Sequence, residues 1–179
     1  MLTLRADLEA ALLQARTSSP TAVGWLEQAP AGAHAISRIQ AMPAGISLEA
    51  CRRALWRWDL HRRAGLRAVA DGEVAVGTNV VLQARFGALS ATAPCRVVRV
   101  IDTPVRVGFE YATLPGHPEM GVESFEFVSG DDHGIHFVMQ AVSRPAFIGS
   151  RMLPFVARRI QQRITDRYVQ AALDIARGG

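Results

Sequence analysis

The sequence predicts an α+β fold in which a curved antiparallel sheet of about six to seven strands wraps around a long C-terminal helix. From residue 66 to residue 142, apolar residues recur mainly at every second position, which is the period of a half-buried strand. No linker in this region has the length of a crossover helix, so consecutive strands are expected to pair as antiparallel hairpins. From residue 147 to residue 175 the period becomes helical, and one long helix can cover one face of such a sheet.

Individual strands are predicted where alternating runs are bounded by turn-forming residues. The first is expected at 34–42 and ends before Pro43. Turn signals such as Asp71-Gly72 and the Ser-Gly-Asp-Asp run at 129–132 separate the later strands. These later strands are expected at 66–70, 78–86, 95–101, 105–111, 122–128 and 135–142.

Two further helices are predicted in the first third of the chain. Apolar residues at helical spacing indicate one at 3–16, with Arg16 at the end that the helix dipole favours for a cation. Another is predicted at 48–61, where Ser47 can cap the first turn. We expect residues 1–33 to form a helix and a loop that pack on a single domain covering residues 1–179.

The composition is typical of a soluble globular domain, with 49% hydrophobic and 20% charged residues. All 20 basic residues are arginines, and because they are scattered along the chain rather than clustered with aromatic residues, nucleic-acid binding is not predicted. Charged residues interrupt every apolar run before it could span a bilayer, so we expect a cytoplasmic protein without stable membrane insertion. Cys51 and Cys95 lack metal-binding or redox spacing, and the sequence has no phosphate-loop or dinucleotide-binding motif, so neither a metal nor another cofactor is predicted.

One stretch, residues 107–127, gathers most of the residues that can carry chemistry. Alternation places Glu123 on the same strand face as Phe125 and Phe127. Between the two strands, the prolines and the glycine of TLPGHPE predict a rigid loop that carries a histidine and a glutamate. The apolar face of the preceding strand is predicted to consist of Val105, Val107, Phe109 and Tyr111.

The motif GF-x-Y-x-TLPGHPE, followed by G-x-E-x-F, resembles that of an uncharacterised family of bacterial and plant proteins. That family, a domain of unknown function, is similar to the START-like helix-grip superfamily, which includes SRPBCC proteins and plant pathogenesis-related allergens. The resemblance extends from Val23 through the segment ALWRWDLHRRAGL to Tyr168, so it covers most of the chain. It implies the helix-grip fold more than any activity. Val122 and Ala112 depart from the pattern, in which the first position is usually acidic and the second usually glycine.

Glu123 has two interpretations. Burial on a face with Phe125 and Phe127 would raise its pKa and make it a general acid or base. Alternatively, Glu123 forms a buried ion pair with Arg96, which alternation places on an inward face with two valines.

Other polar residues also have two possible roles. His117 either projects toward a cavity mouth, oriented by Glu119, or ties down its own loop. Tyr111 either binds a ligand headgroup or bonds a backbone carbonyl, and Arg144 either binds an anionic group at the cavity entrance or caps a carbonyl. His117, Glu119 and Glu123 have metal-binding side chains, but their spacing matches no standard metal site.

These patterns favour the binding of a hydrophobic small molecule or lipid in a cavity between the sheet and the C-terminal helix. The walls are predicted to be Val80, Leu82, Phe109, Tyr111, Phe125, Phe127, Phe137, Met139, Trp58 and Ile160. The polar groups at this site are predicted to be Arg96, Tyr111, His117, Glu119, Glu123 and Arg144. The alternative is an enzyme that uses Glu123 and His117 as acid–base groups on an apolar substrate. A third class, a nucleic-acid or interaction module, would show salt-dependent binding through the arginine face of the last helix, Arg159, Arg163 and Arg167. The sequence carries no signal for an oligomeric state.

Overall fold

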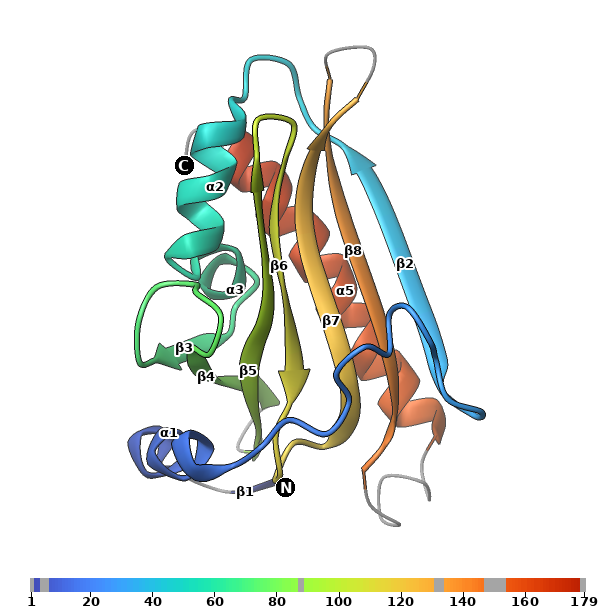
Figure 1. Ribbon diagram of the computed structural model, residues 1–179. Coiled ribbons are helices and arrows are strands. Elements are labelled where there is room, and N and C mark those ends of the chain that lie inside the picture. The colour runs from blue at the N-terminus through green and yellow to red at the C-terminus, as the bar shows by residue number, and fades with distance from the viewer. Residues whose placement is uncertain (1, 4–6, 87–88, 131–133, 147–153, 178–179) are drawn as a thin grey trace.

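In the computed structural model, which describes residues 2–3, 7–86, 89–130, 134–146 and 154–177, a curved antiparallel sheet packs against one long helix (Figure 1). The sheet order is β2–β8–β7–β6–β5–β4–β3, and the short strand β1 pairs with β5. The helix α5 (Pro154–Ala176) lies along the concave face. The predicted α+β helix-grip architecture is confirmed. The strands are β1 (Leu2–Thr3), β2 (His34–Ala41), β3 (Arg67–Ala70), β4 (Asn79–Phe86), β5 (Leu89–Thr103), β6 (Arg106–Thr113), β7 (Glu119–Ser129) and β8 (Ile135–Pro145).

The first helix, α1 (Leu8–Thr17), starts later than predicted. Its N-cap is Asp7, whose carboxylate accepts hydrogen bonds from the backbone N–H groups of Glu9 and Ala10. The prediction of a helix from residue 3 was wrong at this end because Leu2–Thr3 pairs with β5 as a strand. For the C-terminal helix, the predicted segment 147–153 lies outside the described residues.

The predicted helix at 48–61 is two helices, α2 (Leu48–Trp56) and α3 (Asp59–Arg63). Ser47 caps α2 as predicted, accepting a hydrogen bond from the N–H of Ala50. The break is at Trp58, which has the left-handed values φ 63° and ψ 18°. Its indole N–H donates a hydrogen bond to the carbonyl of Gly72, and this bond fixes the position of the ring at the break between the two helices.

Several strands are longer than their alternating patterns predicted. β5 begins before Pro94, because the proline lies within a paired strand and its carbonyl accepts a hydrogen bond from the N–H of Leu114. β7 begins at Glu119, inside the predicted loop. Val105 was expected on the core face but lies in the β5–β6 turn, where it is 59% exposed.

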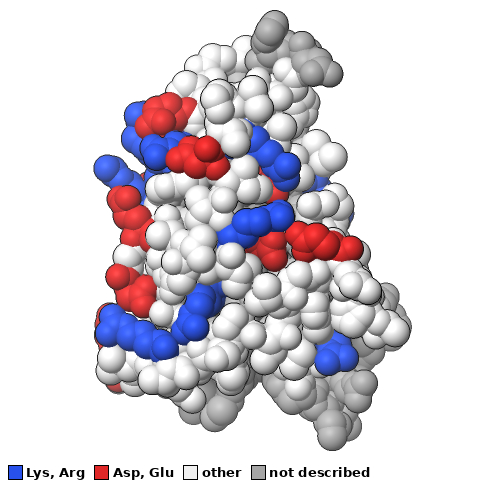
Figure 2. Space-filling view, in the orientation of Figure 1, with Lys and Arg blue, Asp and Glu red and all other residues white. Residues whose placement is uncertain are grey.

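Apolar residues cover both faces of the sheet. On the concave face, the aromatic residues of β6, β7 and β8 pack against α2, α3 and α5. On the convex face, Ala112, Val122 and Val142 pack beneath the segment between α1 and β2, which contributes Trp25 and Leu26. The polar residues of the convex face are mixed in sign, with arginine and acidic side chains next to one another in Figure 2.

Candidate functional site

The candidate site lies on the concave face, where the inward residues change from apolar to polar toward the β6–β7 loop. Glu123 of β7 is half-buried and is paired in the sheet with Tyr111 of β6 and Ala141 of β8. Further along the same side of β7 lies Phe125, which is fully buried. Glu123 is therefore on the inner face, as alternation predicted, at the boundary between the packed core and the polar end of the sheet.

Two tyrosine hydroxyls and one carboxyl lie close together at this position. The hydroxyl of Tyr111 donates to Oε2 of Glu123 at 2.6 Å. The hydroxyl of Tyr168, from α5, lies near this pair, and besides burial the charge of Glu123 contributes to raising the pKa of that hydroxyl. Both tyrosines are almost completely buried. The position of Tyr168 next to Tyr111 and Glu123 was not predicted. The sequence signal that could have indicated it is the place of Tyr168 on the apolar stripe of the last helix.

Burial controls the protonation of these three side chains. Desolvation raises the pKa of Glu123 to about 7, although the hydrogen bond from Tyr111 acts in the opposite direction. Desolvation also raises the pKa values of the Tyr111 and Tyr168 hydroxyls well above the ordinary value. Near neutral pH, Glu123 is thus present in both protonation states while the tyrosines remain hydrogen-bond donors.

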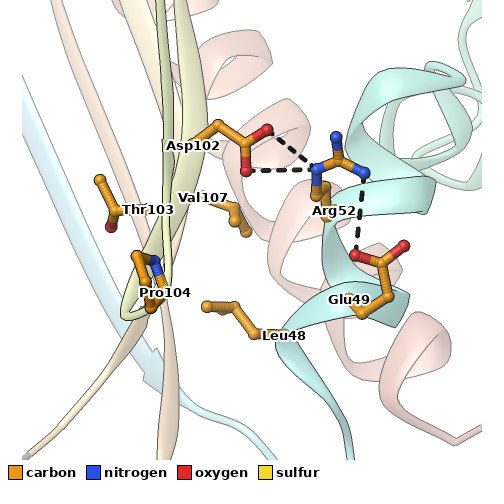
Figure 3. A pocket seen from close by; sticks show the side chains of 7 residues that line it. All are labelled: Leu48, Glu49, Arg52, Asp102, Thr103, Pro104 and Val107. Atoms are coloured by element: carbon orange, nitrogen blue, oxygen red, sulfur yellow. Dashed lines mark hydrogen bonds and ion pairs between the residues drawn. The ribbon is translucent and has the colours of Figure 1, made fainter.

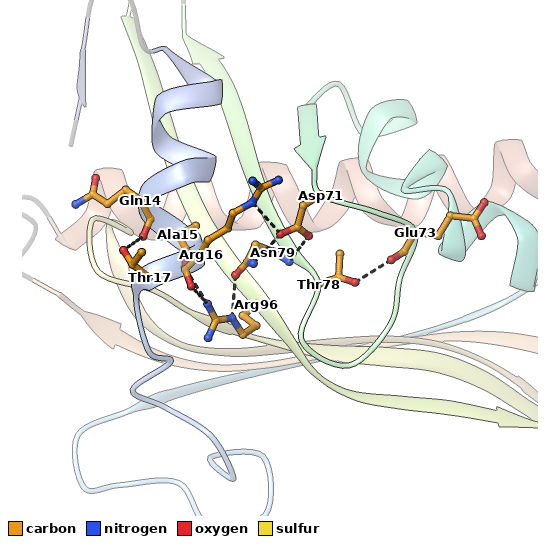
Figure 4. A network of polar contacts seen from close by, with 9 residues as sticks. All are labelled: Gln14, Ala15, Arg16, Thr17, Asp71, Glu73, Thr78, Asn79 and Arg96. Atoms are coloured by element: carbon orange, nitrogen blue, oxygen red, sulfur yellow. Dashed lines mark hydrogen bonds and ion pairs between the residues drawn. The ribbon is translucent and has the colours of Figure 1, made fainter.

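The predicted ion pair between Glu123 and Arg96 is absent, because the two side chains lie on opposite faces of the sheet. Arg96 donates from Nε to Oδ1 of Asn79 and from Nη2 to the carbonyl of Ala15, each at 2.8 Å (Figure 4). Its cross-strand partner is Ala112, which belongs to the convex-side cluster. Arg96 therefore fastens α1 to the sheet and is not part of the concave site.

Arg144 is also on the convex side, contrary to the prediction that it binds at the cavity entrance. Its guanidinium lies 5.3 Å from the ring centroid of Trp25, and its Nη2 contacts the sulfur of Met120. The next residue back along β8, Ser143, points to the other face and donates to the carboxylate of Glu119. Glu119 therefore does lie at the polar end of the concave side.

His117 ties down its own loop. The Nδ1 of its ring accepts a hydrogen bond from the backbone N–H of Glu119 at 2.9 Å, and the backbone N–H of His117 donates to the carbonyl of Leu114. Desolvation lowers the pKa of the His117 ring to about 4, so the ring is neutral at neutral pH. Of the two predicted roles, this geometry matches the one in which the histidine holds the loop.

The predicted walls of the cavity pack against one another in the middle of the concave face. The aromatic ring centroids there are 4.7–6.0 Å apart. Of the predicted wall residues, those with 2% or less of their surface exposed are Trp58, Val80, Phe109, Tyr111, Phe125, Phe127, Phe137 and Met139. A void large enough for water would leave surface accessible on its lining, so none borders these side chains. The side chain of Ile160 lies outside the described part of the chain.

An open hollow of about 480 Å³ lies at the opposite end, between α2 and the β5–β6 turn (Figure 3). Arg52 of α2 and Asp102 of β5 form an ion pair across this hollow, in which Nε of the arginine lies 3.0 and 3.2 Å from the two carboxylate oxygens. Leu48 and Val107 supply its apolar lining. No sequence signal pointed to this pair, because its members are fifty residues apart and belong to different elements.

Within the described residues, no group of three or more histidine, cysteine, aspartate or glutamate side chains is arranged to hold a metal ion. Among the helices of the same part of the chain, none combines the length and the apolar character needed to cross a bilayer.

Comparison with protein families gives a match that covers most of the chain. The family model described as "Domain of unknown function (DUF1990)" matches residues 19–171. The chain belongs to this family. In this DUF1990 protein the matched region includes Tyr111, Glu123 and Tyr168, the residues of the candidate site. No curated protein matches the chain in sequence.

Solved structures share the fold of this DUF1990 protein at low sequence identity. A hypothetical protein from Helicobacter pylori is 7% identical, with a TM-score of 0.63 over 86% of this chain and 92% of the other. Ara h 8.0201 is 11% identical, with a TM-score of 0.58 over 83% and 100% of the two chains. The Zhui aromatase/cyclase from Streptomyces sp. R1128 is 18% identical, with a TM-score of 0.53 over 82% and 92%. These similarities establish the helix-grip fold, which is compatible with ligand binding.

Proposed function

We propose that this DUF1990 protein binds an apolar small molecule or lipid carrying one polar group, and that Glu123 and Tyr111 hold that group. The observation that supports this most strongly is the half-buried carboxyl of Glu123, which is hydrogen-bonded to Tyr111 at the edge of the aromatic cluster on the concave face. Tyr111 supplies one hydrogen bond, and an ionised carboxylate can accept several more. A guest that donates to Glu123 would satisfy this remaining capacity while its apolar part contacts the concave face.

The binding site differs from the one expected from the sequence. We place it at the polar end of the concave face, around Glu123 and Tyr111, rather than in the middle of the sheet. The middle is filled by buried aromatic side chains. A guest bound only in the middle would have to displace several of those side chains, whereas Glu123 is already partly accessible.

A second candidate function, acid–base catalysis on an apolar substrate, is favoured by the pKa of Glu123. At about 7, that pKa lets the carboxyl take up or release a proton near neutral pH. In the sequence-based hypothesis His117 was the second acid–base group, but its Nδ1 is bonded to the N–H of Glu119. Tyr111, in direct contact with the carboxyl, is therefore the more suitable partner.

The binding proposal is tested with N-phenyl-1-naphthylamine, an uncharged fluorescent probe with one N–H donor. We expect saturable binding to the native protein and about tenfold weaker binding to Glu123→Gln, because a hydrogen bond to a charged acceptor is lost. Ser124→Ala is the matched control. Ser124 neighbours Glu123 on β7 but points to the convex side, where its hydroxyl has no partner among the described residues. Absence of saturable binding, or equal affinity in all three proteins, would overturn the proposal.

The two candidate functions are separated by following the fate of the guest. Small molecules from a cell extract are incubated with native protein and with Glu123→Gln, and both mixtures are analysed by mass spectrometry. A binding protein retains its guest without changing its mass. An enzyme converts a compound into a product with the native protein only.

A further inference from the structure

His61 of α3 is fully buried, and both of its ring nitrogens lack a hydrogen-bond partner among the described residues. Desolvation lowers the pKa of the ring to about 3, so the ring is neutral at neutral pH. A neutral imidazole has one N–H donor and one nitrogen acceptor. Both are unsatisfied here, whereas buried polar groups in folded proteins almost always have partners.

Aromatic rings surround His61. The ring centroids of Trp58, Phe109, Tyr111, Phe125 and Tyr168 lie 5.0–5.9 Å from that of the imidazole. A phenylalanine would fill such a position without an unsatisfied polar atom. This cage of five aromatic rings explains how the imidazole ring is packed, but it gives no structural reason for a histidine at this position.

The backbone next to His61 is in an unfavourable conformation. Trp58, one turn earlier, has φ 63°, which is uncommon for a residue with a side chain. This conformation ends α2 and starts α3, and so carries His61 into the core. Unfavourable backbone conformations persist where the surrounding structure fixes them, and they are frequent at functional sites.

Tyr168, one of the five rings of the cage, lies between His61 and the proposed site. The Tyr168 ring lies 5.2 Å from the imidazole, and its hydroxyl lies near Tyr111 and Glu123, which are hydrogen-bonded to each other. The rings from β6 and β7 are fixed by the backbone hydrogen bonds of the sheet, whereas α5 is not part of that sheet. Tyr168 is therefore the residue that a ligand entering from the Glu123 end would have to displace to reach His61.

We infer that His61 is a second polar contact of the ligand and that the ligand is an aromatic molecule bearing a hydroxyl group. This inference rests on the proposed function, because the ligand reaches His61 from the Glu123–Tyr111 end. The cage of aromatic rings suits an aromatic guest. A hydroxyl both donates and accepts, so it matches the donor and the acceptor of the neutral imidazole.

The test compares 2-naphthol with naphthalene, which has the same rings without the hydroxyl. We expect the native protein to bind 2-naphthol about tenfold more tightly, a preference typical of a buried hydrogen bond. The variant His61→Phe keeps an aromatic ring in the cage and is expected to lose the preference. If both proteins show the same preference, or neither shows one, the inference is overturned while the proposed function stands. If the native protein binds neither compound, nor N-phenyl-1-naphthylamine, both are overturned.

A second measurement avoids dependence on the folding of the variant. In native protein labelled with ¹⁵N-histidine, the His61 ring nitrogens should shift on addition of 2-naphthol and not on addition of naphthalene. Unchanged His61 resonances at saturating 2-naphthol would overturn the inference.

Discussion

The raised pKa of Glu123 makes the stability of the protein depend on pH in a defined direction. Burial raises this pKa from 4.5 to about 7 in the folded protein. Below pH 4.5 the carboxyl is protonated in both the folded and the unfolded state, so its contribution to stability is fully present. As the pH rises toward 7, the unfolded state ionises more readily than the folded state, and that contribution is lost. Once the pH is well above 7, the carboxyl is ionised in both states and no further change is expected.

The magnitude follows from the two pKa values. A difference of about 2.5 corresponds to roughly 3.4 kcal/mol, at 1.36 kcal/mol for each pKa unit. Solvent reaches the half-buried side chain, so about 2–3 kcal/mol is the expected loss between pH 4.5 and pH 7.5. Glu123→Gln removes the titration and keeps a side chain of similar shape. Relative to the native protein, the variant should gain this amount of stability over the same pH interval.

The measurement is urea denaturation of both proteins at pH values from 4.5 to 8. Taking the difference in unfolding free energy cancels contributions that the two proteins share, including those of His61 and His117. Tyr111→Phe is the matched comparison: it removes the hydrogen bond that lowers the Glu123 pKa, so its loss of stability should extend to higher pH. A difference between native protein and Glu123→Gln that does not vary with pH would refute the reasoning.

Three further predictions concern the fold. Gly121→Ala should destabilise the protein by about 1–3 kcal/mol or more in urea denaturation, because an added Cβ would lie 2.3 Å from the carbonyl oxygen of Val142; unchanged stability would contradict the close approach of β7 and β8. Arg96→Met and Glu123→Gln should be additive to within about 0.5 kcal/mol, since the side chains lie on opposite faces, and a larger coupling energy in the double variant would restore the ion pair expected from the sequence. Ser47→Ala should lower the unfolding free energy by about 1 kcal/mol through loss of the α2 cap, and a thermal melt identical to that of the native protein would argue against the cap.

The error over Arg96 shows where alternation along a strand stops being informative. Counting from Val100, which packs against the concave core, places Arg96 on the same inward face. The register of β5 against β6 shifts between Val97 and Arg99, and an extra residue at such a bulge reverses the inward and outward positions beyond it. No bulge interrupts the pairing of β7 with β6, so the face predicted for Glu123 was correct.

The break between α2 and α3 was also not predicted from the sequence, because apolar periodicity does not report it. Leu55 and Trp58 are spaced as on one helical stripe, and both are buried, so the apolar pattern was read correctly. Periodicity reports which side chains are buried and does not distinguish a continuous helix from two helices joined by one left-handed residue. The burial of His61 depends on that residue and could not be predicted.

By itself, the sequence determined the order of the main strands and of the long C-terminal helix, the antiparallel pairing, the packing of one helix on one curved sheet and the inward position of Glu123. These follow from local periodicity and short connections, which depend on residues close together in the chain. Only the tertiary structure decided the partners of the polar side chains: Tyr168 beside Tyr111 and Glu123, Asn79 beside Arg96, and the aromatic rings around His61. Those contacts join residues far apart in the sequence, and the register, bulges and helix breaks that bring them together result from packing of the whole chain.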